Sequence, residues 1–315
     1  MNTNHNFLIS NIMDKKIPKT IRITRTNYLR DDYDRDGIKT EKFVETEIFY
    51  NESGKVLKEN HYSAENEIES MVENQYNDHG LVSSSSQYDQ NHELCQKNIF
   101  SYDEQQRIIR KGCFYGEESP EYATHYVYEN GLLIREDSYD EDEFAYTEKE
   151  YTYDDHGSII KLIEYDEDGE IMYRTTNEYD EKQQLIKRTR EELLEHDSRT
   201  FTFQYDERGN KTKELLYNYD MRLIAKAYYQ YDEADNCVVM EEENLDIYRK
   251  TTYAYCNGNC VKITQYDKED KLLTWTDYTY NENNDIVRVQ NNIADEVSPE
   301  EYRIAFIVEY ETEWY

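Results

Sequence analysis

Ten tyrosines recur along the chain at intervals of 24 to 26 residues, and this repeat restricts the fold more than any other feature of the sequence. These anchor tyrosines are Tyr50, Tyr76, Tyr102, Tyr128, Tyr153, Tyr179, Tyr205, Tyr231, Tyr255 and Tyr280. A second set of aromatic residues lies about half a period further on, at Tyr62, Tyr88, Phe114, Tyr139, Tyr165, Tyr217 and Tyr266. A fixed period over nearly the whole chain indicates a repeat architecture whose unit is about 13 residues.

Thirteen residues accommodate one strand and one turn. The segment before an anchor alternates between apolar and polar side chains, as in residues 201–205 (FTFQY), which is the two-residue period of a strand. An Asp-x-x-Gly turn follows, as in residues 154–157 (DDHG), where the Asp caps the turn and the Gly supplies a positive φ. Two adequate helices do not fit in this spacing, so a helical repeat is excluded. We predict an all-β protein of roughly two dozen strands in a long antiparallel meander, forming a curled sheet or an open barrel or spiral.

The two ends depart from the repeat and define three segments. Residues 1–27 contain no anchor and are expected to cap the first edge strand, and residues 28–296 form the repeat domain. Residues 297–315 are expected to supply a capping strand, because residues 304–314 alternate strictly. The alternative for this last segment is a helix that starts with the capping box at Ser298.

The composition excludes several classes of protein. The chain has 69 Asp and Glu against 36 Lys and Arg, a formal net charge of −33, so a phosphate backbone would be repelled and no direct binding to nucleic acid is expected. No apolar stretch is long enough for a membrane helix, and the first 20 residues do not resemble a signal peptide. Five cysteines then indicate reduced thiols and a cytoplasmic location.

No motif for catalysis, metal binding or a cofactor stands out. The segment Asp32–Gly37 begins like a calcium-binding loop, but Phe43 occupies the place of the bidentate Glu, so we interpret it as an Asp-rich turn. Cys256 and Cys260 are a close pair without further ligands nearby, and we interpret them as part of a degenerate turn. A regular repeat also gives each carboxylate a similar environment, whereas catalysis needs a few perturbed groups. The protein is therefore expected to have no enzyme activity, no metal site and no cofactor.

The Tyr-Asp-x-x-Gly turns at Tyr153, Tyr165 and Tyr205 resemble the YD repeat of Rhs and teneurin-type proteins. This resemblance covers residues from about 33 to 290 and implies a β-sheet that winds into a shell. The chain is too short for a large shell and lacks the Asp-Pro motif that ends the Rhs shell. In its repeat style, acidity and size it is also similar to the β-repeat antitoxins and immunity proteins of bacterial polymorphic toxin systems.

The acidity points to a basic protein partner of a monomeric chain. The candidate contact residues are the acidic clusters and one tryptophan: Asp137, Asp140, Glu141, Asp142, Glu143, Asp166, Glu167, Asp168, Glu241, Glu242, Glu243 and Trp275. Acidic side chains steer association with a basic partner, and aromatic side chains supply contact energy. Three functions stay open: an immunity protein or antitoxin that sequesters a toxin domain, a nucleic-acid mimic that inhibits a defence nuclease, and a structural shell or scaffold fragment.

Overall fold

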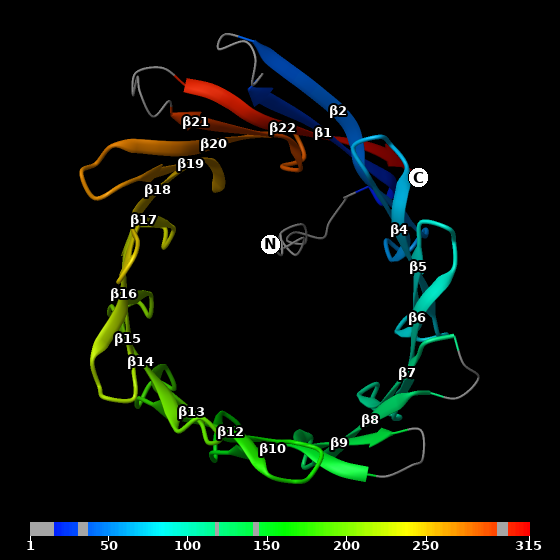
Figure 1. Cartoon of the computed structure of the whole chain (residues 1–315), viewed down its shortest axis with the longest axis vertical. Helices are drawn as coiled ribbons and strands as arrows, with labels where there is room; N and C mark the ends of the chain where they lie inside the picture. The colour runs from blue at the N-terminus through cyan, green and yellow to red at the C-terminus, as the bar shows by residue number, and fades with distance from the viewer. Residues whose placement is uncertain (1–15, 31–36, 117–119, 141–144, 295–301) are drawn as a thin grey trace. The chain divides into compact units, whose positions relative to one another are not determined.

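A computed structural model describes residues 16–30, 37–116, 120–140, 145–294 and 302–315, and in this part of the chain all regular structure is β-strand. The prediction of an all-β repeat protein is confirmed, with 22 strands in an antiparallel meander (Figure 1). The described residues include no helix long and apolar enough to cross a membrane.

The strands are mostly seven to nine residues long, and three have thirteen. They are β1 (Pro18–Arg30), β2 (Ile38–Tyr50), β3 (Val56–Tyr62), β4 (Ile68–Tyr76), β5 (Val82–Asp89), β6 (Leu94–Tyr102), β7 (Ile108–Phe114), β8 (Tyr122–Glu129), β9 (Leu132–Asp140), β10 (Ala145–Tyr153) and β11 (Ile159–Tyr165). They continue with β12 (Ile171–Tyr179), β13 (Leu185–Glu192), β14 (Asp197–Tyr205), β15 (Lys211–Tyr217), β16 (Leu223–Tyr231), β17 (Cys237–Asn244), β18 (Tyr248–Cys256), β19 (Asn259–Tyr266), β20 (Leu272–Tyr280), β21 (Ile286–Ala294) and β22 (Tyr302–Trp314).

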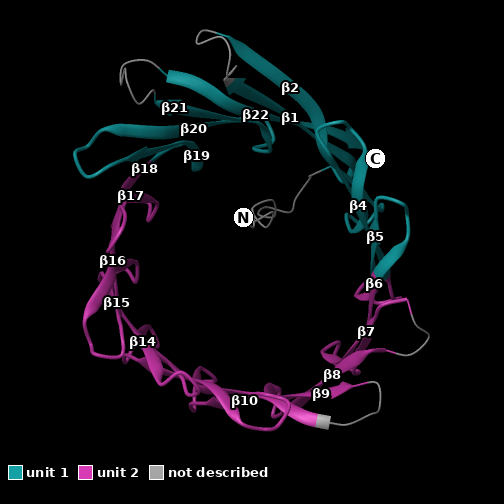
Figure 2. Ribbon diagram, in the orientation of Figure 1, with its two compact units in different colours: residues 1–75, 86–95, 253–315 teal, residues 76–85, 96–252 magenta. Residues whose placement is uncertain are grey.

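The chain divides into two compact units (Figure 2). Unit 1 comprises residues 1–75, 86–95 and 253–315, and unit 2 comprises residues 76–85 and 96–252. In unit 1, β1 pairs antiparallel with β2 on one side and with β22 on the other, so that Ile23 lies opposite both Thr46 and Tyr310. In unit 2, each strand from β7 to β17 pairs with the next strand of the chain.

Both ends of the described chain are strands. Residues 18–27, which carry no anchor tyrosine, form most of β1. The alternating segment 304–314 lies within β22, and this strand has hydrogen-bonded neighbours, β21 and β1, on both sides. The capping box at Ser298 and the Asp-rich segment before Gly37 lie outside the described residues.

Every even-numbered strand from β2 to β20 ends with an anchor tyrosine or one residue after it. The turn at Asp206 shows why the chain reverses there. The carboxylate Oδ1 of Asp206 accepts hydrogen bonds from the backbone N–H groups of Arg208 and Asn210, both at 2.9 Å, and Gly209 takes a φ of +95°. The strand register shifts next to Tyr205, as expected for a turn that closes with a bulge.

Successive turns of an antiparallel meander alternate between the two ends of the strands. In unit 2 we call the turns after β10, β12, β14 and β16 the first rim, and the turns after β11, β13, β15 and β17 the second rim. Each rim therefore receives one turn for every 24 to 26 residues of sequence.

Few side chains are fully buried. The one apolar core cluster found among the described residues lies in unit 1, where Ile23, Ile48 and Val308 come together from β1, β2 and β22. Elsewhere the buried positions on the strands are mostly small and polar, such as Thr175, Thr200 and Thr251. Half-buried rings and aliphatic stems on a pleated surface thus provide most of the packing.

Candidate binding surfaces

Six of the ten anchor tyrosines link neighbouring hairpins through their hydroxyl groups. In each case the Tyr Oη donates to the backbone carbonyl oxygen twenty residues earlier, at 2.7–2.9 Å. The pairs are Tyr102–Val82, Tyr153–Leu133, Tyr179–Ile159, Tyr205–Leu185, Tyr231–Lys211 and Tyr280–Cys260. Burial raises the pKa of Tyr205 and of Tyr231, so these hydroxyls stay protonated and act as donors. The hydroxyls of these six anchors are therefore engaged within the fold.

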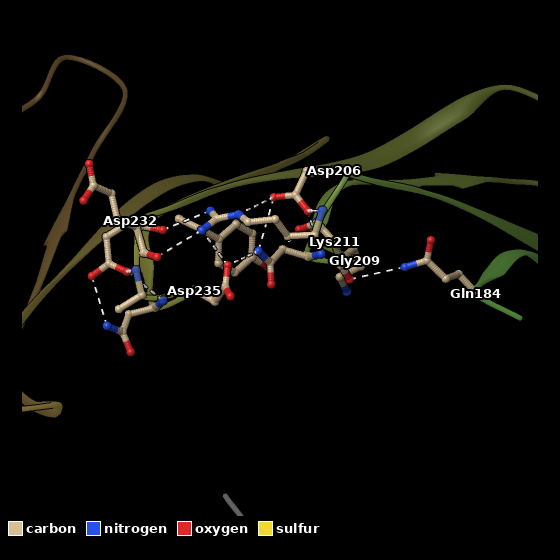
Figure 3. Close-up of polar contacts among 12 residues, drawn as sticks. Gln184, Asp206, Gly209, Lys211, Asp232 and Asp235 are labelled. Carbon is tan, nitrogen blue, oxygen red and sulfur yellow. Dashed lines mark hydrogen bonds and ion pairs between the residues drawn. The ribbon is translucent and has the colours of Figure 1, made fainter. Parts of the chain in front are cut away.

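Polar side chains also join successive turns of the first rim (Figure 3). Arg208 Nη1 lies 2.8 Å from Asp235 Oδ1, and Asn210 Nδ2 donates to the same oxygen at 2.7 Å. One turn earlier, Gln184 Nε2 donates to the carbonyl oxygen of Gly209 at 3.4 Å. Polar groups of each of these turns therefore form hydrogen bonds or ion pairs with the next turn of the first rim.

Two capping aspartates of the first rim, Asp206 and Asp232, have lowered pKa values. The backbone N–H of Asn210 and the Asn210 side chain lower the pKa of Asp206, and Asn236 does the same for the pKa of Asp232. Since a carboxylate that accepts backbone hydrogen bonds favours its charged form, these side chains contribute fixed negative charge along the rim.

The predicted contact residues of the first acidic cluster divide into two kinds. Asp137 is buried on β9, with 8% of its surface exposed, and its carboxylate pairs with Arg135 at 2.8 Å and accepts from Thr147 at 3.2 Å. Asp140 is exposed at the end of β9. Glu141, Asp142 and Glu143 lie outside the described residues.

The next predicted cluster is a turn of the second rim. Asp166 caps this turn by accepting from the backbone N–H groups of Asp168 and Glu170, at 3.1 and 2.8 Å. Glu167 and Asp168 are exposed at its tip.

The third predicted cluster lies within strand β17. Glu242 and Glu243 are half-buried there and pair with Arg249 (3.6 Å) and Lys226 (2.7 Å) on the neighbouring strands, while Glu241 lies opposite Tyr228 and Lys250. Strands β12 to β16 separate β17 from the turn at Asp166 in the order of hydrogen-bonded strands. The structure therefore does not bring the acidic clusters of unit 2 into one patch.

Trp275 belongs to unit 1 and is half-buried on β20. Its indole Nε1 donates to Asp277 at 3.0 Å, and its ring packs edge-on against Tyr302 with centroids 4.8 Å apart. The ammonium of Lys262 lies 5.5 Å from the ring centroid. The indole N–H and ring of Trp275 are therefore already engaged in contacts within unit 1.

The second rim of unit 2 carries a feature that sequence reasoning missed. Three consecutive turns place large apolar side chains at their exposed tips: Leu194 after β13, Tyr219 and Met221 after β15, and Leu245 after β17. Their exposed fractions are 60%, 62%, 60% and 84%. The available signal was that Leu, Tyr and Met replace the polar residues of an Asp-x-x-Gly turn at these tips.

A groove of about 560 Å³ joins the three turns. Its lining includes Glu195, His196, Tyr219, Ile224 and Leu245, so side chains from all three turns contribute to one surface. Ile247, two residues after Leu245, lines a separate groove of about 290 Å³ over β14 to β18.

The described residues contain no group of three or more His, Cys, Asp or Glu arranged to hold a metal ion. All five cysteines are free thiols, and burial raises the pKa of Cys237 and Cys260, which disfavours the reactive thiolate.

In sequence comparisons, no protein-family model and no curated protein matches the chain. Among solved structures, the chain is similar to a chain of the TcdB2-TccC3-Cdc42 complex, with 11% identity, a TM-score of 0.31 and coverage of 79% of this chain and 15% of that one. For TcdB2-TccC3 without its hypervariable C-terminal region the values are 10%, 0.24, 82% and 20%. For a porin-like protein from Bacteroides uniformis they are 9%, 0.33, 94% and 98%. The chain thus spans 15% and 20% of the length of the two TcdB2-TccC3 chains, and at these scores none of the likenesses informs its function.

Proposed function

We propose that this chain is a non-enzymatic binding protein that holds a basic protein partner. The excess of carboxylates over basic side chains carries the proposal. Even if each of the 36 Lys and Arg paired with its own acidic residue, 69 − 36 = 33 carboxylates would have no basic partner within the chain. A basic protein surface supplies the missing positive charge and is attracted at long range.

Turn geometry alone does not require this charge. At eight turns an aspartate Oδ1 accepts the capping backbone hydrogen bonds: Asp89, Asp103, Asp154, Asp166, Asp180, Asp206, Asp232 and Asp267. At three others an uncharged asparagine makes the same pair of bonds: Asn51, Asn77 and Asn281. Because Asn makes the same bonds, a negative charge is not required at these turns, and the many aspartates add charge that repels itself.

The partner class follows from the resemblance to YD repeats and to β-repeat immunity proteins. On that basis the partner is a toxin domain, basic if its substrate is a nucleic acid, and this chain is its immunity protein or antitoxin. A nucleic-acid mimic shares the same electrostatics but blocks a defence nuclease. A shell or scaffold fragment would have no discrete basic target.

Affinity capture with salt washes tests the proposal. The tagged protein is incubated with lysate of the source organism and washed at about 0.05 and then 0.5 M salt, a range over which the screening length falls steeply. We expect one basic protein at near-stoichiometric amount, identified by mass spectrometry, whose own activity distinguishes toxin from defence nuclease. A mixture of abundant basic proteins that leaves with salt would contradict the proposal and favour the scaffold.

A parallel measurement separates charge used for binding from charge used for solubility. Folding stability should rise with salt, since self-repulsion is screened, while partner affinity should fall. If affinity were unchanged by salt, electrostatic attraction would not be the basis of binding.

A further inference from the structure

We infer that the second rim of unit 2 is a docking site for a basic amphipathic α-helix of the partner. This inference rests on the proposed function, because it assigns a place and a shape to the basic surface that the chain binds. The site consists of the apolar tips Leu194, Tyr219, Met221 and Leu245 together with the exposed carboxylates Glu195, Asp220 and Asp246, and we call it the apolar rim.

Charge and apolar surface alternate along the apolar rim. Each of its three turns places one exposed carboxylate directly beside an exposed apolar tip, as in Leu194-Glu195, Tyr219-Asp220-Met221 and Leu245-Asp246. Two cations lie among them: Arg222 is exposed after Met221, and Arg199 in the groove pairs with Asp197. A partner that matches this pattern carries one basic and one large apolar side chain per turn contacted. Apolar contact supplies the affinity, and the carboxylates select the positive charge.

The spacing of the turns favours a helix over a strand. Successive turns of one rim are two strands apart, which is about 10 Å at the usual strand separation. Seven residues of an α-helix advance about 10.5 Å and return to the same face. Residues on one face of an extended strand are about 6.8 or 13.6 Å apart, and neither spacing matches the distance of about 10 Å between successive turns.

Met221 occupies a turn position at which the chain takes a positive φ. Met221 adopts a φ of +57°, in the left-handed region that a side chain with a Cβ enters only under strain, and its side chain is 60% exposed. The corresponding turn after β11 has Gly169 there, with a φ of +80°. Met221 is one of eleven non-Gly residues with a positive φ in the described part of the chain, so its exposure and not its backbone conformation assigns it to the apolar rim.

The neighbouring turn after β11 belongs to the same rim but has no apolar tip. Its exposed residues are Glu167, Asp168, Gly169 and Glu170. It provides a matched acidic control within unit 2. Neutralising Glu167, Asp168 and Glu170 removes three negative charges, the same number as neutralising the three carboxylates of the apolar rim.

The test uses a synthetic 21-residue peptide, helical by circular dichroism, with Lys and Leu each recurring every seven residues on one face. Its binding to the full chain is measured by fluorescence anisotropy at low salt. The triple variant Leu194→Ser, Met221→Ser, Leu245→Ser should weaken binding about tenfold or more, as expected for loss of contact hot spots. The control triple is Leu57→Ser, Ile109→Ser, Ile186→Ser, at positions that are 37–41% exposed. Its affinity for the peptide should stay within about twofold of the unmodified chain.

A shuffled peptide of identical composition, with Lys and Leu spread around the helix, tests the match in spacing. We expect it to bind about tenfold more weakly than the patterned peptide. Equal binding of both peptides, or equal loss in both triple variants, overturns the docking site while the proposed function stands. If neither peptide binds, the docking site is also overturned, whereas the proposed function fails only if the affinity capture retains no basic protein.

The variant Met221→Gly separates a binding role from a structural one. Removal of the strained side chain should raise the thermal midpoint and at the same time weaken peptide binding. A lower midpoint would show that Met221 supports the fold, and unchanged binding would remove it from the site.

Discussion

The hydroxyl of Tyr179 donates a hydrogen bond to the carbonyl oxygen of Ile159, 2.9 Å away, and thereby links the hairpin of β12 and β13 to the preceding hairpin of β10 and β11. The same contact, with the same separation of twenty residues, recurs at five further anchors. Each of these hairpins is thus joined to the preceding one by a tyrosine side chain as well as by the backbone hydrogen bonds of the sheet.

This link predicts the effect of removing single hydroxyls. Tyr205→Phe should lower the free energy of unfolding by about 1 kcal/mol, because the carbonyl of Leu185 loses its side-chain donor. The triple variant at Tyr179, Tyr205 and Tyr231 should lose about 3 kcal/mol if the sites are independent. Urea unfolding measures both.

Tyr217→Phe is the matched control, since no hydrogen bond of the Tyr217 hydroxyl is found among the described residues and its ring is equally half-buried. A similar loss in Tyr217→Phe would show that the hydroxyl bonds of the anchors contribute nothing specific.

Stability should decline at alkaline pH. Burial raises the pKa of Tyr205, Tyr231 and Tyr278, so the folded state holds these phenolic protons more tightly than the unfolded chain does. The resulting stabilisation is complete below the unfolded value of about 10 and is lost as the pH rises through the folded values. Urea midpoints at several pH values, with tyrosinate absorbance as the second readout, should show a plateau near neutrality and a fall above about pH 10. A flat profile well beyond that pH would contradict the assignment.

The turn caps predict different outcomes for two substitutions of Asp206. Its pKa is lowered, chiefly by the backbone N–H of Asn210, so its contribution is present above about pH 4, the unfolded value, and is lost as the pH falls through the folded value. Asp206→Asn keeps the acceptor, as Asn77 does in its own turn, so at neutral pH it should retain the capping bonds but lose the contribution of the charge, and with it this part of the acid dependence. Asp206→Ala removes the acceptor and should lower the thermal midpoint at every pH. Equal midpoints for the two variants at pH 7 would rule out the capping role.

The core of unit 1 predicts a large and local effect. Ile23 is 5% exposed and packs with Ile48 and Val308, so Ile23→Ala should cost about 3 kcal/mol of unfolding free energy. Ile38→Ala, at a position 60% exposed on the neighbouring strand, should cost less than about 0.5 kcal/mol. Comparable losses at the two positions in urea unfolding would show that the apolar cluster does not stabilise this unit.

The regular part of the fold was predictable because it is encoded locally. Alternation before Tyr205 and the Asp-x-x-Gly turn after it each depend on residues close in sequence, and both signals repeat often enough to be unambiguous. The pairing of β1 with β22 was not predictable, because no local signal specifies which distant strand covers an edge.

The candidate site was less accessible to sequence reasoning. Asp137 and Glu167 have the same chemistry in sequence, yet one is buried beside Arg135 and the other is exposed at a turn. Exposure depends on neighbouring strands and not on the residue type. The apolar rim was missed for the opposite reason, since a Leu or Met near a strand end is indistinguishable from a core residue until the turn around it is placed.

The position of β1 between β2 and β22 has a consequence for synthesis in the cell. Its outer partner follows almost 300 residues later, with Lys19 and Glu313 paired across a separation of 294 residues. At ordinary rates of translation, β1 leaves the ribosome roughly 15 to 60 s before β22 does. During that interval one edge of β1 exposes unpaired backbone groups. Another nascent chain on the same polysome could pair with this edge, so the edge needs protection until β22 is made.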